Sequence, residues 1–175
     1  MRVIGGAFRS RVLKSLPGLD VRPTPDRLRE TLFDVLAARI EGVVFADIYA
    51  GTGAVGIEAL SRGASRAIFV EQGRAAVHTI RENLRSLGIE ARAQVRHGRA
   101  TAILPQIEAD IVFVDPPYRL EQDYERSLAI LGENAPALVI VQHAARFSLA
   151  EKYGRLHRSR LLKQGDNALS FYQVE

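Results

Sequence analysis

The sequence predicts a doubly wound α/β fold, in which helices cover both faces of a mostly parallel sheet. Short apolar runs rich in β-branched residues alternate with longer amphipathic segments. The short runs are typical of strands, and the longer segments are typical of the helices that connect parallel strands. The run at residues 111–114 is apolar throughout, which is typical of a strand buried on both faces. A glycine-rich turn at residues 51–56 separates the first core strand from a helix. Ligands in such folds bind at the carboxyl ends of the strands.

We expect one domain whose sheet has seven strands. The strands are predicted at residues 43–50, 67–70, 91–96, 111–114 and 137–141, and then as an antiparallel pair at 158–162 and 169–174. Helices are predicted from the glycine turn to residue 62, and at 74–87, 102–107 and 122–131. Gly88 is expected to end the helix at 74–87.

The first 22 residues are expected to form a basic β-hairpin ahead of a catalytic core at residues 23–175. Its strands are predicted at residues 3–6 and 10–16, with Phe8 at the tip. A helix then follows, with Thr24 as its N-cap and Pro25 at its first position. The apolar stripe of that helix consists of Leu28, Leu32, Val35 and Leu36, and the sequence places Arg27, Arg29 and Glu30 off this stripe.

Composition excludes several classes of protein. The chain has no Cys, which rules out disulfide frameworks, cysteine-based zinc sites and thiol nucleophiles. Its histidines lack metal-ligand spacing, and we expect no metal. We see no signal peptide and no long apolar run, so the expected location is the cytoplasm, without a membrane partner. The net charge of +4, with basic residues clustered near both ends, indicates a polyanionic partner.

The end of the first core strand indicates an adenosine-containing ligand. Gly51, Gly53 and Gly56 match the dinucleotide pattern, and Glu71 stands where an acid can accept from two ribose hydroxyls. A nicotinamide-dependent oxidoreductase is therefore one alternative. Asp47 argues against it, because a carboxylate at the strand mouth would oppose a pyrophosphate but complement an ammonium or sulfonium group. S-adenosylmethionine carries both cations and no phosphate.

The tetrapeptide Asp115-Pro116-Pro117-Tyr118 follows the buried strand at residues 111–114. Two prolines fix two φ angles and leave their carbonyl groups free to accept hydrogen bonds. Asp115 adds a charged acceptor, and Tyr118 adds a flat ring. Acceptors beside an aromatic plane suit a nucleobase that carries an amino group.

Together these residues resemble the bacterial small-subunit ribosomal RNA guanine-N2 methyltransferases that modify guanine 966 of 16S rRNA. The resemblance rests on V-I-G-G-A-F-R-S-R-V-L at 3–13, R-P-T-P-D-R-L-R-E-T-L-F-D at 22–34, D-I-Y-A-G-T-G-A-V-G-I-E-A-L-S-R-G-A at 47–64 and V-D-P-P-Y at 114–118. The R-P-T and E-A-L-S-R-G-A blocks are specific to this family, whereas glycine turns and D-P-P-Y are shared more widely among amino-methyltransferases.

The resemblance implies a Rossmann-like, S-adenosylmethionine-dependent methyltransferase fold and a set of site residues. Cofactor binding is expected at Asp47, Ala50, Gly51, Gly53, Glu71, Gly98, Arg99, Ala100 and Asp115. The chain departs from the family at Arg99, so contact with the adenine is expected to use the backbone there. It also has Gln142 where the family tends to have Glu.

The expected reaction is methylation of a guanine exocyclic amine. Asp115 and the Pro116 carbonyl would accept its hydrogens, Pro117 would stiffen the loop, and Tyr118 would stack on the base. The RNA contacts are predicted at Arg2, Arg9, Arg11, Lys14, Arg22, Thr24, Arg27 and Arg29. The expected partner is 16S rRNA or an assembling small ribosomal subunit, bound by a monomer. An adenine-N6 methyltransferase and a catalytically silent RNA-binding protein are the alternatives.

Overall fold

The computed structural model describes residues 1–17 and 24–175 of the chain. The helices are η1 (Gly6–Phe8), α1 (Asp26–Leu36), α2 (Ala54–Ser61), α3 (Arg74–Leu87), η2 (Glu90–Arg92), α4 (Ala100–Ile103), η3 (Leu104–Gln106) and α5 (Glu121–Glu133). The strands are β1 (Val44–Ile48), β2 (Arg66–Glu71), β3 (Ala93–His97), β4 (Ile111–Val114), β5 (Leu138–Ala144), β6 (Lys152–Tyr153), β7 (Leu156–Gln164) and β8 (Asn167–Val174).

The described strands form one sheet in the order β3-β2-β1-β4-β5-β8-β7-β6. The first five strands are parallel, and β8, β7 and β6 extend the sheet with antiparallel pairs. The α/β fold is confirmed, but the sheet has eight strands where seven were expected. The additional strand, β6, has only two residues. A segment that short has no alternation that a sequence could reveal.

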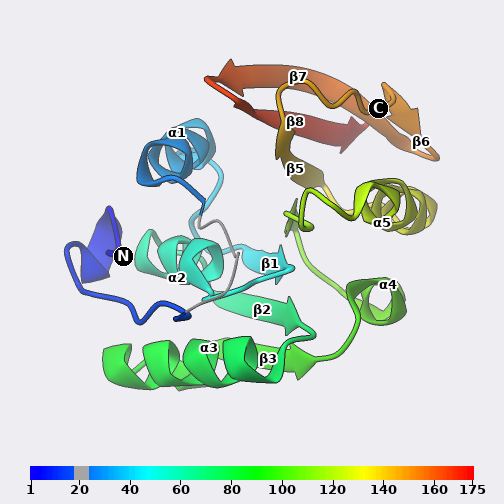
Figure 1. The fold of residues 1–175 in the computed structure, drawn as a ribbon. Coiled ribbons are helices and arrows are strands. Elements are labelled where there is room, and N and C mark those ends of the chain that lie inside the picture. The colour runs from blue at the N-terminus through cyan, green and yellow to red at the C-terminus, as the bar shows by residue number, and fades with distance from the viewer. Residues whose placement is uncertain (18–23) are drawn as a thin grey trace.

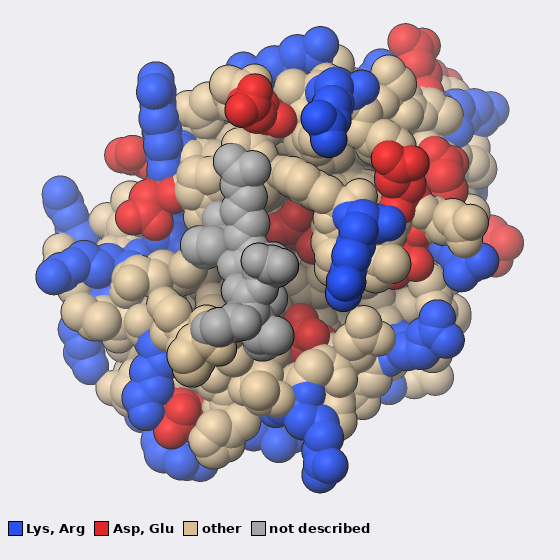
Figure 2. All heavy atoms as spheres, in the orientation of Figure 1, with Lys and Arg blue, Asp and Glu red and all other residues tan. Residues whose placement is uncertain are grey.

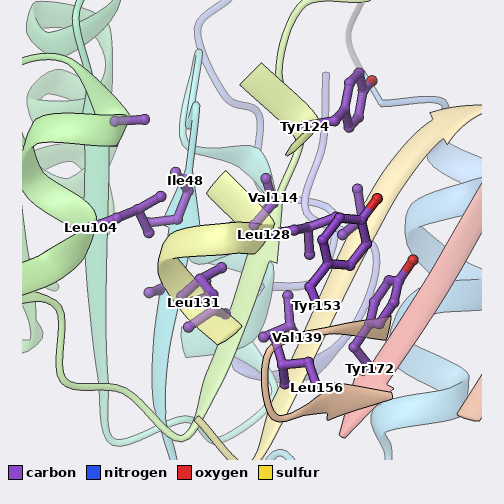
Figure 3. Close-up of a cluster of buried hydrophobic side chains, with 14 of the residues drawn as sticks. Ile48, Leu104, Val114, Tyr124, Leu128, Leu131, Val139, Tyr153, Leu156 and Tyr172 are labelled. Carbon is purple, nitrogen blue, oxygen red and sulfur yellow. The ribbon is translucent and has the colours of Figure 1, made fainter. Parts of the chain in front are cut away.

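Helices cover both faces of the sheet, with α1, α2 and α3 on one side and α4 and α5 on the other (Figure 1). Alternate residues of each core strand enter different clusters: Ile111 and Phe113 pack with α1 and α2, whereas Val112 and Val114 pack with α5. Figure 3 shows the second of these clusters, where Leu128 and Leu131 meet the strands. No helix in the described part of the chain is long and apolar enough to cross a membrane.

The N-terminal segment is not the regular hairpin that the sequence predicted. One antiparallel bridge joins Arg2 to Val12, and the η1 turn takes the place of a tight loop. Gly6 has φ +78°, and a Cβ there would lie 2.0 Å from the Ser61 carbonyl oxygen. The segment therefore lies directly against the end of α2. Backbone hydrogen bonds still join its two arms, from the Val3 N–H to the Arg11 carbonyl (3.0 Å) and from the Leu13 N–H to the Met1 carbonyl (2.8 Å), so this pairing and the contact with α2 together determine its path.

Three side chains of α2 and its C-terminus hold this segment in place. Glu58 accepts hydrogen bonds from the backbone N–H groups of Ile4 (2.9 Å) and Gly5 (2.8 Å). Ser61 Oγ donates to the Gly5 carbonyl at 2.6 Å. Arg62 Nε donates to Glu58 at 2.9 Å. Polar backbone groups of the segment thereby find partners inside the protein.

The start of α1 also differs from the prediction. The helix begins at Asp26, and Pro25 occupies the N-cap with an extended backbone (ψ 137°) and without a side-chain cap hydrogen bond. Thr24 Oγ1 donates instead to Asp115 Oδ2, at 3.4 Å. Thr24 therefore links the N-terminal part of the chain to the end of β4 and caps no helix.

Candidate cofactor and base site

The glycine turn at the end of β1 is built on a buried carboxylate. Asp47 Oδ2 accepts the backbone N–H of Gly56 at 2.9 Å, and the residue is only 2% exposed. Gly53 has φ +82° and forms the N-cap of α2. Burial raises the pKa of Asp47 well above its usual range, and the nearby carboxyls of Asp115 and Glu71 raise it further. The three acidic groups are thus close enough to repel one another.

Glu71 connects the carboxyl ends of neighbouring strands. Its Oε2 accepts the Gly51 N–H at 2.8 Å and its Oε1 accepts the Gly73 N–H at 2.9 Å. The Gly98 N–H donates to the Glu71 carbonyl at 3.0 Å, which draws the end of β3 to the same place. A carboxylate has about four acceptor positions, so Glu71 can hold the turn and still accept from ribose hydroxyls.

A cavity of about 430 Å³ lies at these strand ends. Its lining includes Tyr49 after β1, Gln72 after β2, and Arg99 and Ala100 at the start of α4. The start of α5 and the two residues before it close the other side, with Arg119, Leu120, Glu121, Gln122, Asp123 and Arg126. The cavity is large enough for an adenine ring, and it adjoins the acid expected to bind the ribose.

Asp115 is half-buried at the end of β4, with its backbone N–H bonded to the Ile48 carbonyl at 3.3 Å. Burial raises the pKa of its carboxyl to about 7, and the hydrogen bond from Thr24 lowers it only in part. The side chain is therefore balanced between acceptor and donor at neutral pH.

The two residues that were expected to assist Asp115 are also fixed by hydrogen bonds. The Pro116 carbonyl accepts from the Tyr124 hydroxyl at 3.3 Å, which leaves one of its two lone pairs for a ligand. The Tyr118 hydroxyl donates to Asn167 Oδ1 at 2.6 Å, so β8 helps to set the position of the ring. Pro117, between them, is exposed.

A second cavity, of about 230 Å³, lies beside Tyr118. Its other lining residues are Glu121, Tyr124, Ala144, Arg146 and Phe147. Sequence reasoning missed this cavity, because Arg146 and Phe147 follow β5 in a segment without any motif. Tyr49 was also not predicted as a site residue, although it lies in the D-I-Y-A-G-T-G block, and its φ of +62° is rare for a residue with a side chain.

Most of the predicted RNA contacts lie on the surface, but one is wrong. Arg2, Arg9, Arg11, Lys14 and Arg27 are exposed, and Thr24 is half-buried. Arg22 lies outside the described residues. Arg29 is fully buried, donates to the Arg2 carbonyl at 2.5 Å and pairs with Asp26 at 3.2 Å and Glu58 at 3.9 Å. It cannot reach RNA, because it binds the N-terminal segment to α1.

Charge is distributed unevenly on the face that Figure 2 shows. Lys and Arg side chains are spread over this face, with acidic side chains among them toward the edge, and further acidic atoms are visible in a hollow near its centre. Within the N-terminal segment, Lys14 pairs with Glu82 at 3.0 Å and Arg11 donates to the Ser86 carbonyl at 3.0 Å. Both contacts are exposed, so both cations remain available to a polyanion.

The chain matches one protein family over residues 1–173, described as conserved hypothetical protein 95. It is 37% identical over its full length to ribosomal RNA small subunit methyltransferase D of Escherichia coli K12, of which it covers 90%. The solved structure of Escherichia coli yhhF has a TM-score of 0.87 and 37% identity, with 100% of this chain and 98% of that chain covered. An RNA methyltransferase of Salinibacter ruber, solved with S-adenosyl-L-homocysteine, shares the fold at 20% identity and a TM-score of 0.67, with coverage of 87% and 93%.

The fold and the arrangement of carboxylates at its strand ends define a Rossmann-like methyltransferase. The chain belongs to the conserved hypothetical protein 95 family, together with the small-subunit ribosomal RNA methyltransferase of Escherichia coli.

Proposed function

We propose that the protein transfers a methyl group from S-adenosylmethionine to the N2 amine of a guanine in small-subunit ribosomal RNA. The observation that carries this proposal is the position of Asp115, which presents a carboxyl group beside the acids of the glycine turn. The relationship to a ribosomal RNA methyltransferase supports RNA as the substrate. The choice of guanine, at position 966, follows the sequence resemblance described above.

The residues at the strand ends fit this cofactor. The acidic group formed by Asp47, Glu71 and Asp115 would lower the energy of its ammonium and sulfonium charges. Glu71 would accept the ribose hydroxyls, and the cavity between Gln72 and Arg99 would take the adenine. Ala50, Gly51, Gly53, Gly98 and Ala100 would provide backbone contacts. When bound, the cofactor supplies an electrophilic methyl group with its own leaving group.

The chain's own contribution to the chemistry is to orient and activate the amine. The lone pair of guanine N2 is delocalised into the ring, and it becomes nucleophilic only when the amine pyramidalises. Asp115 Oδ and the Pro116 carbonyl would accept one N–H each and stabilise the positive charge that develops on the nitrogen. Tyr118, held by Asn167, would stack on an extruded base and fix its plane. Asp115 or solvent then receives the proton.

This mechanism predicts a pH dependence centred on Asp115. Only the ionised carboxylate accepts with both oxygens and balances the positive charge on the nitrogen, and burial raises the pKa of Asp115 to about 7. We expect kcat/KM to rise with pH between 6 and 8, because kcat/KM reports the free enzyme. The cationic cofactor, when bound, would favour the ionised form of Asp115. The midpoint of the pH profile of kcat should therefore lie at a lower pH than that of kcat/KM. A flat kcat/KM profile over this range, measured with RNA of unchanged folding, would contradict the proposal.

The N-terminal segment, residues 1–22, is proposed to replace a separate RNA-binding domain ahead of the core at 23–175. We expect Arg9→Ala with Arg11→Ala to weaken RNA binding and reduce the slope of log Kd against log salt by about 1–2. Affinity for the cofactor should stay unchanged. Arg39→Ala with Arg66→Ala is the matched control, because both arginines are exposed at the amino-terminal edge of the sheet. Equal effects of the two pairs would refute the assignment.

The direct test is transfer of labelled methyl groups to small-subunit RNA and to subunit particles that lack the modification. Label in N2-methylguanosine supports the proposal, and label in N6-methyladenosine assigns the enzyme to the adenine alternative. Stoichiometric cofactor binding without transfer would favour a silent RNA-binding protein. We further propose that the enzyme acts in the cytoplasm as a monomer, which sedimentation of the active species would check.

A further inference from the structure

One buried side-chain oxygen near Asp115 has no hydrogen-bond partner among the described residues. Gln142, on β5, is only 4% exposed, and among the described residues its Oε1 has no hydrogen-bond partner. Leaving a buried acceptor unpaired costs on the order of 1–3 kcal/mol. Such an atom in a binding site commonly marks a place where a ligand supplies the missing donor.

The sheet register places Gln142 beside Asp115. Val114 on β4 pairs with Val141 on β5, and the next residues along the two strands are Asp115 and Gln142. Paired residues of parallel strands project from the same face, and neighbouring strands lie about 4.8 Å apart. This face is the one on which Phe113 and Ile140 pack against α1. Asp115 and Gln142 therefore occupy neighbouring positions on one face of the sheet, and each carries a side-chain oxygen that can accept a hydrogen bond.

The next residue of β5 has its hydrogen bonds satisfied within the protein. His143 projects from the opposite face, where its Nε2 bonds to Ser170 Oγ at 2.8 Å and its Nδ1 to the Ala144 carbonyl at 2.9 Å. Polar groups at this end of the sheet can thus be paired by the fold itself. Gln142 is the exception, and it lies on the side that carries Asp115 and its partner Thr24.

We propose that Gln142 selects guanine by accepting the N1–H of the target base while Asp115 accepts from the adjacent N2 amine. Guanine presents these two donors on neighbouring atoms of one edge, which matches two neighbouring acceptors. Adenine has an unprotonated N1, which would face the Gln142 oxygen without a hydrogen. This inference rests on the proposed function, and it adds the residue that would read the base.

The test compares two bases at the position that the wild-type enzyme methylates. One RNA carries guanine, and the other carries 2-aminopurine, which keeps the reacting amine but has no hydrogen on N1. Each is measured with the wild-type enzyme and with Gln142→Met, a variant of similar volume without a strong acceptor. For each enzyme we take the ratio of the kcat/KM values for the two bases. Comparing this ratio between the wild type and Gln142→Met isolates the contact between N1–H and Gln142, because 2-aminopurine lacks O6 in both measurements and that effect cancels.

We expect the wild-type enzyme to prefer guanine, and Gln142→Met to reduce that preference roughly tenfold, the worth of one hydrogen bond to a buried acceptor. Gln142→Glu should raise the preference above that of the wild type, since a carboxylate only accepts whereas an amide can turn its NH₂ group toward N1. This second variant keeps the inference testable if Gln142→Met folds poorly.

An unchanged preference in Gln142→Met, with both rates lowered alike, would show a structural role and overturn the inference. The same holds if Gln142→Glu leaves the preference at or below the wild-type value. Methylation of the guanine RNA by the wild-type enzyme is measured as a separate result. Its absence would overturn the proposed function itself, and a normal wild-type rate with an unaltered ratio would overturn only the role of Gln142.

Discussion

Asp115→Asn is expected to lower kcat for methyl transfer by roughly 10²–10³-fold, the usual cost of removing one group that stabilises developing charge. The amide keeps the size of the carboxyl group but cannot balance a positive nitrogen, and its NH₂ end would oppose the amine. RNA should bind as before, and the affinity for the cofactor should fall only in part, because Asp47 and Glu71 of the same acidic group keep their positions in the glycine turn. Single-turnover kinetics with equilibrium binding of both ligands would measure the two effects separately.

The same substitution is expected to stabilise the protein at alkaline pH. Burial raises the pKa of Asp115 in the folded protein to about 7, above the ordinary value of an aspartate, so the folded protein holds the proton more tightly than the unfolded chain. The contribution of this group to stability is present below pH 4 and is lost as pH rises to about 7. Asp115→Asn removes that loss and should raise Tm at pH 8 relative to the wild type, with little change at pH 4. A lower Tm at pH 8 would mean that the lost activity reflects damage to the fold.

Local patterns predicted those parts of the fold that depend on neighbours in sequence. The apolar run at 111–114 coincides with β4, and Gly88 ends α3 in a left-handed conformation with φ +69°. The site residues at strand ends were also predictable, because parallel strands bring their carboxyl ends to one edge whatever the loops between them.

The errors arose where contacts distant in sequence decide the outcome. Arg29 lies next to the apolar stripe of α1, and the sequence gives no sign that residues 1–6 cover that side of the helix. In the structure the Arg2 carbonyl lies against this side of α1 and accepts a hydrogen bond from Arg29, which is buried. Thr24 is similar: its sequence context favours a cap, but Asp115, 91 residues away, receives its hydrogen bond. Unpaired atoms such as Gln142 Oε1 appear only when the whole structure is known.

Glu58→Gln should be the most destabilising of these substitutions. Glu58 is fully buried, and its two oxygens serve Ile4, Gly5 and Arg62, with Arg29 nearby at 3.9 Å. An amide of the same shape can accept with only one oxygen, and it leaves the buried Arg29 with the exposed carboxylate of Asp26 as its remaining counter-charge. Breaking a buried ion pair in this way costs about 3–5 kcal/mol. We expect a corresponding loss in the free energy of unfolding, measured with urea.

The N-terminal segment should lose its structure first, because four of its hydrogen bonds are made with this carboxylate and with Ser61. In Glu58→Gln we expect faster hydrogen exchange at the amides of Ile4 and Gly5, and weaker RNA binding through the displaced Arg9 and Arg11. Asp34→Asn is the matched control: its carboxylate also faces Arg62, at 3.9 Å, but its side chain is 72% exposed. An exposed pair of this kind is worth about 0–1 kcal/mol. If both variants lost equal stability, the segment would owe its position to apolar contacts of Val3 and Leu13 in the core, and not to Glu58.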